Sequence, residues 1–118
     1  MKQAAVQLPI VSSTIQSIRN TLMLSQEDLA RALGLSVRTV VRWEKEGAEP
    51  PPLERERLHL IHEIIEIAQD IMEPEDVASW FSKPKEALSG RRPLDILSSF
   101  RGIQSVREIL EKTRWGIF

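Results

Sequence analysis

Apolar residues recur along this chain every three or four positions, the spacing that gives a helix one apolar face. The longest such run extends from Leu53 to Met72 and predicts a single amphipathic helix. Shorter runs predict further helices over about 13–23, 26–33, 37–45, 74–81, 93–100 and 103–114, with a turn or short helix over 83–90. This pattern favours helices over strands, and we expect an all-α fold.

Residues that begin and end helices stand at several of these boundaries. Ser25 is followed three positions later by Asp28, as in a capping box at the start of the helix over 26–33. Gly34 can end this short helix. Ser36 can cap the following helix. The Pro50-Pro51-Pro52 run predicts a rigid boundary, and its last proline suits the first turn of the long helix.

The composition is that of a globular protein with one compact domain or two small modules that share a core. The chain has 118 residues and no cysteine, so disulfides and thiolate metal sites are excluded. The first thirty residues lack the basic start and apolar run of a signal peptide, and no later run is long enough to span a membrane. We therefore expect a cytoplasmic protein that binds no membrane.

The charge is unevenly distributed along the chain. Residues 1–45 hold six basic and three acidic residues, residues 46–79 hold two basic against ten acidic, and residues 80–118 hold eight basic against four acidic. A basic first segment can approach a polyanion, whereas the acidic middle is repelled by one. Because solvated helix faces explain much of the acidic stretch, this distribution supports nucleic-acid binding only weakly.

Residues 24–44, LSQEDLARALGLSVRTVVRWE, carry the features of two short helices that cross steeply. Such a crossing needs a small residue at the contact and a glycine in the turn, which Ala30 and Gly34 provide. The apolar positions that would close the small core are Leu29, Leu33, Leu35, Val40 and Trp43. This stretch resembles the Xre (lambda-repressor-like) family of DNA-binding domains. The resemblance implies a helix-turn-helix whose last helix enters a major groove.

The polar residues of this unit suit contacts with DNA. Arg38 and Arg42 are four positions apart on one helix face, and either could bind guanine O6 and N7. Gln26 stands where the Xre family hydrogen-bonds a phosphate at a helix N-terminus. Thr39 is a candidate for a phosphate or base, and Val37 for a thymine methyl. The predicted DNA-binding residues are Gln26, Val37, Arg38, Thr39, Val41 and Arg42.

From Val77 onward a second spaced pattern is visible. Its members are Trp80-Phe81, Pro84, Leu88, Gly90, Pro93-Leu94-Asp95-Ile96-Leu97, Gly102, Val106, Leu110 and Gly116. This order resembles the C-terminal toxin-binding domain of Xre/MbcA/ParS-type antitoxins. The resemblance implies a RES-domain toxin as the partner, a toxin class that degrades NAD at its N-glycosidic linkage.

Most of this second pattern is expected to be structural. Trp80 and Phe81 are predicted to be buried, and Asp95 to stabilise the N-terminus of its helix. Phe100 is predicted to face inward at the end of a helix over 93–100, and Gly102 to break the chain before the last helix.

The exposed part of the second half supplies the candidate toxin contacts. An uncovered apolar end is costly in water, so the last four residues either fold back or enter a partner. The resemblance implies that this end is directed at the toxin's active site. The predicted toxin-binding residues are Arg91, Arg92, Arg107, Arg114, Trp115, Gly116, Ile117 and Phe118, with Lys83, Lys85 and Arg101 as further exposed cations.

The sequence offers no positive case for catalysis. His59 and His62 stand three apart on the long helix, followed by Glu63 and Glu66, a spacing that can hold a metal. No third ligand follows at a characteristic spacing, and a solvated helix face is the favoured interpretation. The sequence contains neither a glycine-rich phosphate loop nor a nucleophile elbow. We expect no enzyme activity, no cofactor and no metal.

The hypothesis is an all-α homodimeric antitoxin in which a lambda-repressor-like helix-turn-helix is joined by a long helix to a small helical toxin-binding domain. Its parts are an arm over 1–11, the DNA-binding domain over 12–60 and the toxin-binding domain over 61–118, with the helix over 53–72 shared. The antitoxin would bind and occlude a RES-domain toxin and bind operator DNA. The alternatives are an Xre-family repressor whose C-terminal half only dimerises or senses a ligand, and a pure protein-interaction module.

Overall fold

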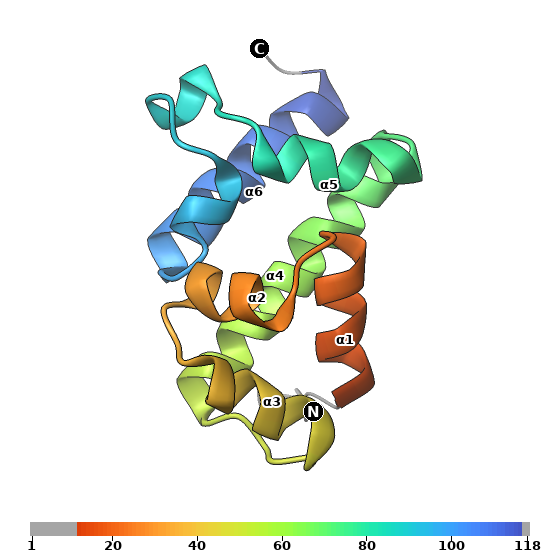
Figure 1. The fold of residues 1–118 in the computed structure, drawn as a ribbon. Coiled ribbons are helices and arrows are strands. Elements are labelled where there is room, and N and C mark those ends of the chain that lie inside the picture. Colours follow the sequence, from red (N-terminus) through yellow and green to blue (C-terminus); the bar gives the residue numbers. More distant parts are fainter. Residues whose placement is uncertain (1–11, 117–118) are drawn as a thin grey trace, which may run out of the picture.

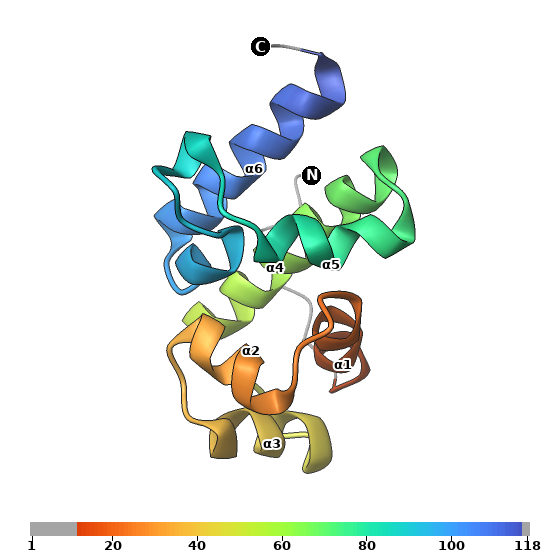
Figure 2. The same ribbon diagram turned by 45° about the horizontal axis from the view of Figure 1, so that its top comes forward.

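The computed structural model describes residues 12–116, so the predicted arm over 1–11 and the residues Ile117 and Phe118 lie outside the described part. Six α-helices and two short 3-10 helices make up this part (Figures 1 and 2). In chain order they are α1 (Ser12–Thr21), α2 (Gln26–Leu33), α3 (Val37–Lys45), α4 (Pro52–Ile71), α5 (Pro74–Ser82), η1 (Glu86–Leu88), η2 (Pro93–Ile96) and α6 (Phe100–Trp115). The all-α expectation is confirmed for these residues.

The first three helices form the predicted helix-turn-helix unit. The Ser25 hydroxyl accepts a hydrogen bond from the Asp28 N–H, and the Asp28 carboxylate accepts one from the Ser25 N–H, so the capping box is present. Gly34 ends α2 in the left-handed conformation with φ of 71°. Apolar side chains of all three helices are buried together, among them Ile15, Ile18, Leu29, Leu33, Val40 and Trp43. The local signals therefore gave these boundaries correctly.

Helix α4 connects the two halves of the molecule. It runs through the middle of the fold, with α1–α3 around its N-terminal part and the later helices around its C-terminal part (Figure 1). Its buried face packs on α1, α5 and α6 and contains Leu58, Ile61, Ile64, Ile65, Ile67 and Ala68. The apolar pattern begins at Leu53, but this residue lies in the first turn of the helix and is 66% exposed. One continuous apolar core joins both halves.

The segment before α6 differs from the prediction. Instead of a helix over 93–100, a short 3-10 helix ends at Ile96 and α6 begins at Phe100, whose side chain is 38% exposed rather than directed inward. Gly102 does not break the chain but lies buried inside α6. The physical reasons are a local cap and a close contact: the Ser99 hydroxyl accepts a hydrogen bond from the Gly102 N–H, and the Gly102 Cα faces the Ile96 carbonyl.

Within residues 12–116 no helix is both long and apolar enough to cross a membrane.

Candidate nucleic-acid interface and partner-binding face

Helix α3 presents one face to the core and the other to solvent. Val40 and Trp43 are buried against α1 and α2, whereas Val37, Arg38 and Arg42 are exposed on the other side. The Arg42 side chain is 52% exposed and lies 4.0 Å from the Glu46 carboxylate, a distance typical of a weak surface ion pair. An exposed helix face with two arginines one turn apart can enter a DNA groove.

The remaining predicted DNA contacts on α3 are partly buried. Val41 and Thr39 are half-buried at the edges of the exposed face. The Thr39 N–H donates to the Ser36 hydroxyl, and the two hydroxyl oxygens lie 2.9 Å apart. Thr39 therefore takes part in the N-cap of α3, and its hydroxyl is held at the end of the helix that would face a phosphate.

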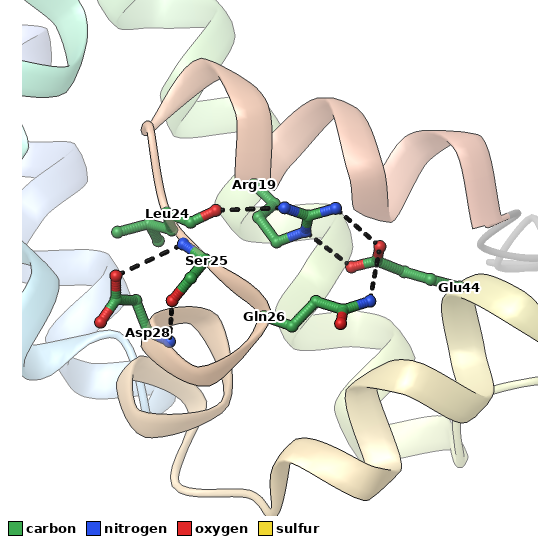
Figure 3. Close-up of polar contacts among 6 residues, drawn as sticks. All are labelled: Arg19, Leu24, Ser25, Gln26, Asp28 and Glu44. Atoms are coloured by element: carbon green, nitrogen blue, oxygen red, sulfur yellow. Dashed lines mark hydrogen bonds and ion pairs between the residues drawn. The ribbon is translucent and has the colours of Figure 1, made fainter.

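A buried carboxylate holds α1, α2 and α3 together behind this face (Figure 3). The Glu44 side chain is only 1% exposed and accepts hydrogen bonds at 3.0 Å from both Nε and Nη2 of Arg19. Arg19 also donates to the Leu24 carbonyl at 3.3 Å. Because the charged guanidinium is stabilised by Glu44, the pKa of Arg19 is raised. This two-bond pair fixes α3 relative to α1.

Gln26 belongs to the same network. Its amide nitrogen donates to the Glu44 carboxylate at 3.3 Å, and its side chain is drawn between α2 and α3 in Figure 3. A glutamine amide carries two N–H groups, so the one not bonded to Glu44 remains for a phosphate oxygen. Sequence reasoning missed Glu44, although a signal existed. Glu44 stands four residues after Val40 and directly after Trp43, so it lies on the apolar face of the helix.

The predicted toxin contacts fall into two groups rather than one. Arg107 and Arg114 lie two turns apart on α6 and line a polar cavity of about 470 Å³ with Glu63, Glu66, Ile67, Gln69 and Asp70 of α4. Arg107 donates to Glu63 at 2.8 Å, and Arg114 lies 3.6 Å from Glu111. Arg91 and Arg92 lie between η1 and η2. Arg91 donates to the Leu88 carbonyl, and Arg92 forms two hydrogen bonds with Asp95.

The end of α6 carries the described part of the apolar tail. Trp115 is 64% exposed, with the Arg114 guanidinium 5.1 Å from its ring centre. Gly116 is in the left-handed conformation with φ of 66°, and its N–H donates to the carbonyls of Lys112 and Thr113. The tail therefore starts with an uncovered aromatic ring, followed by a glycine that turns the chain out of the helix.

A second hollow lies between the two halves. It has a volume of about 680 Å³, and its lining comes from α2 with the preceding turn on one side and from α5 and η2 on the other. Arg92, which precedes η2, and Asp95 of η2 line one side, and Asp28 and Arg31 of α2 line the other. Both arginines are paired within the hollow, Arg92 with Asp95 and Arg31 with Asp28.

Trp80 is half-buried, so the prediction that it is buried like Phe81 is wrong. The two rings meet edge to face with centres 5.1 Å apart, and the Lys85 ammonium covers the Trp80 ring at 4.5 Å. Burial, with a smaller contribution from Lys83, lowers the pKa of Lys85. Trp80 thus packs against the core on one part of its surface and is covered by the Lys85 cation on its ring face.

The described residues contain no group of three or more metal-ligand side chains. His62 lies 3.8 Å from the Glu66 carboxylate on the exposed side of α4. This arrangement is that of a solvated helix face.

Two carboxylates give a prediction about pH. Hydrogen bonding by Ser25, with the ion pair to Arg31, lowers the pKa of Asp28, and hydrogen bonds from Arg92 lower the pKa of Asp95. A carboxyl whose pKa is lower in the folded state stabilises the fold above its unfolded pKa, and this stabilisation is lost as the pH falls through the folded pKa. We expect the melting temperature to fall between about pH 5 and pH 2. The melting temperature should fall less steeply with decreasing pH in Asp28→Asn and in Asp95→Asn than in the wild type, as measured by circular dichroism. Equal slopes in wild type and both variants would contradict this.

Two family models match the chain in the order of its two halves. A helix-turn-helix model matches residues 15–54, and the model of the antitoxin Xre/MbcA/ParS C-terminal toxin-binding domain matches residues 68–116. The boundary between the matches falls within α4, the helix that both halves share.

Relatives and a solved structure agree with this order. The chain is 22% identical over 109 residues to the mycobacterial cidal antitoxin MbcA of Mycobacterium tuberculosis and of Mycobacterium bovis, an alignment that covers 92% of this chain and 96% of the relative. A chain in the crystal structure of the M. tuberculosis MbcT–MbcA toxin–antitoxin complex superimposes with a TM-score of 0.72 at 22% identity, covering 91% of this chain and 96% of that chain. This likeness shows that the two chains share a fold.

Proposed function

We propose that this chain, which belongs to the Xre/MbcA-type antitoxins, neutralises a RES-domain toxin and represses its own operon. One observation carries the proposal: helix α4 joins the unit that contains α3, with its two exposed arginines, to a domain that matches a toxin-binding family. The match to a toxin-binding domain favours this function over a repressor whose C-terminal half only dimerises or senses a ligand. It also favours a binding protein over an enzyme.

The DNA-binding part of the proposal rests on α3. Arg38 and Arg42 read base edges, while Gln26 and Thr39 hold phosphates at the N-terminal ends of α2 and α3. Val37 and Val41 supply apolar contacts for thymine methyl groups. A helix-turn-helix of this size reads only a few base pairs, so two copies are needed for two half-sites, and we propose that the chain acts as a homodimer.

The toxin-binding part rests on α6 and the loops before it. A pocket that accepts NAD must take flat rings and anionic phosphates. Trp115 offers an exposed ring, and Arg114 beside it offers a cation, so this end is chemically suited to fill such a pocket. Arg107 adds a cation two turns earlier on the same helix, and Arg91 and Arg92 extend the surface toward η2. Ile117 and Phe118 would continue the apolar tail.

The proposed domain limits follow the same division, with DNA binding assigned to 12–60 and toxin binding to 61–118. Because α4 belongs to both and one core joins them, neither part is expected to be fully stable without this helix.

We expect loss of the tail to restore toxin activity without unfolding the antitoxin. Deleting residues 116–118 together with Trp115→Ala removes an exposed ring and the C-cap of α6, which affects only the last turn of that helix, so the melting temperature should fall only slightly. Burial of one large aromatic side chain contributes about 1.5–3 kcal/mol, so toxin affinity should fall by roughly tenfold or more. The measurement is NAD consumption by a RES-domain toxin that is co-expressed with each antitoxin variant.

Phe100→Ala is the matched control, because it removes a partly exposed aromatic ring from the other end of α6. Its antitoxin should still silence the toxin. Silencing by the tail-deleted variant at wild-type strength would place the neutralising surface elsewhere.

A further inference from the structure

The side chain of Arg57 joins the two halves of the molecule at a point outside every site described above. Arg57 lies on α4, and its side chain is 10% exposed. Its Nη1 donates to the Leu33 carbonyl at 2.8 Å and to the Ser98 carbonyl at 2.7 Å. Leu33 is the last residue of α2, and Ser98 lies in the loop between η2 and α6. One nitrogen thus bonds the helix-turn-helix unit to the toxin-binding domain.

Both carbonyls lie where a shift of the backbone would matter. The Leu33 carbonyl immediately precedes Gly34, whose left-handed conformation sets the turn from α2 into α3. The Ser98 carbonyl immediately precedes Ser99, the N-cap of α6. The turn and the loop also approach each other directly, because a Cβ on Gly34 would lie 3.7 Å from the Ser98 Cβ. The loop before α6 and the turn before α3 are therefore in contact both directly and through Arg57.

The chemistry of Arg57 makes this connection strong and directional. The bond to the Leu33 carbonyl is buried and the bond to the Ser98 carbonyl is partly buried, so loss of either bond leaves a charged donor less well satisfied in a largely buried site. Arg57 also forms an ion pair with Glu54, whose carboxylate lies 3.8 Å from Nη2. Because Glu54 is on the same helix, this ion pair cannot replace the hydrogen bonds to the Leu33 and Ser98 carbonyls. On the side of α5 a hollow of about 680 Å³ lies between α2 and the later helices, so the polar contact at Arg57 adds to the apolar core that joins the two halves.

We infer that Arg57 is a positioning residue that couples the toxin-binding domain to DNA affinity: loosening the loop before α6 weakens DNA binding by α3. The inference rests on the proposed DNA binding by this chain. It has a consequence for regulation, because Arg92 stands at the start of η2, close along the chain to Ser98. A toxin bound over Arg92 would contact one end of η2, and the loop that holds Ser98 follows the other end.

The test is a double-mutant cycle in the full-length chain, with DNA duplexes that the wild-type protein selects from a random library. Ser99→Ala removes the hydroxyl that caps α6 and so loosens the loop beside Ser98, far along the chain from α3. We expect Ser99→Ala to weaken DNA binding about threefold or more when Arg57 is present. In the Arg57→Met background, which keeps the apolar stem but has no donor, the same change should have almost no further effect.

Thr113→Ala is the matched control. The Thr113 hydroxyl also donates one hydrogen bond to the backbone of α6, to the Ile109 carbonyl at 2.9 Å, but at the far end of the helix. It should leave DNA affinity unchanged in both backgrounds. All affinities are measured by fluorescence anisotropy well below the melting temperature of each variant.

Arg57→Lys keeps the positive charge on a shorter side chain, and we expect it to retain only part of the coupling. If Arg57→Met does not fold, Arg57→Lys replaces it as the second background of the double-mutant cycle. Hydrogen exchange gives an independent measurement, because Ser99→Ala should also speed exchange at the amides of Gly34 and Leu35 in the presence of Arg57.

An equal loss of affinity in both backgrounds, or no loss with Arg57 present, would overturn the inference while leaving DNA binding intact. A wild-type chain that selects no DNA would instead overturn the proposed function, and the inference with it.

Discussion

Replacing both Arg38 and Arg42 with alanine is expected to abolish sequence-specific DNA binding while leaving the fold intact. Both side chains are on the exposed face of α3, and neither contributes to the buried core. A bidentate contact between an arginine and a guanine contributes roughly 1–3 kcal/mol of discrimination, so the double variant should lose about 2–6 kcal/mol. The single variants should each relax the preference at one base position.

The measurement is fluorescence anisotropy with a selected duplex and an unrelated duplex at two salt concentrations. A base contact changes the ratio between the duplexes, whereas a phosphate contact changes both affinities and the salt dependence. Gln26→Ala should weaken binding to both duplexes about equally. Arg101→Ala is the control, an exposed arginine on α6 in the other half. Unchanged affinity in the Arg38/Arg42 double variant would remove α3 as the reading helix.

Gly102→Ala is expected to cause the largest loss of stability of any glycine-to-alanine change in this chain. A Cβ at this position would lie 1.7 Å from the Ile96 carbonyl oxygen and 2.8 Å from the Ile96 carbonyl carbon. Both are backbone atoms, so a rotamer change cannot relieve the contact, and α6 must move away from η2. Forced overpacking of a well-packed core costs about 1–3 kcal/mol, and we place this change at the upper end, about 3 kcal/mol.

Urea denaturation followed by circular dichroism measures this loss. Ser105→Ala, one turn later on the same helix, removes a hydroxyl that donates only to the Arg101 carbonyl, and it should change stability by less than about 0.5 kcal/mol. If Gly102→Ala proved as stable as Ser105→Ala, α6 and η2 could separate at little cost. The close contact would then not be what requires glycine here.

The helix ends that the sequence predicted correctly depend on local contacts, whereas the role of Gly102, which the sequence predicted wrongly, depends on a contact with the preceding 3-10 helix. Caps at Ser25, Gly34 and Ser36 follow from contacts within a few residues, so the residue types alone predict them. The requirement for glycine at position 102 does not come from such a local hydrogen bond. A glycine inside a helical pattern usually signals a break, but here it is required by the approach of Ile96, which no local pattern records.

The candidate site divides in the same way. The exposure of Arg38 and Arg42 follows from the helical period, because Val40 and Trp43 occupy the opposite face. The carboxylate that holds this helix in place could not be assigned a partner from the sequence, since Arg19 and Glu44 are 25 positions apart. The four arginines predicted to bind the toxin separate in the structure into two groups: Arg107 and Arg114 lie on α6, and Arg91 and Arg92 lie beside η2.

By itself, the sequence determined the helical class, the position of the helix-turn-helix, the outward face of α3 and the family resemblance of the second half. Each of these depends on interactions between residues a few positions apart, or on the order of residue types along the chain. Only the tertiary structure decided that Gly102 is a packing residue, that Glu44 is a buried support, and that Arg57 bonds both halves. Those roles are set by atoms brought together from 24 and 41 positions away in the case of Arg57. The physical reason is that helical periodicity constrains which side of a helix is buried, but not which distant backbone group meets it there.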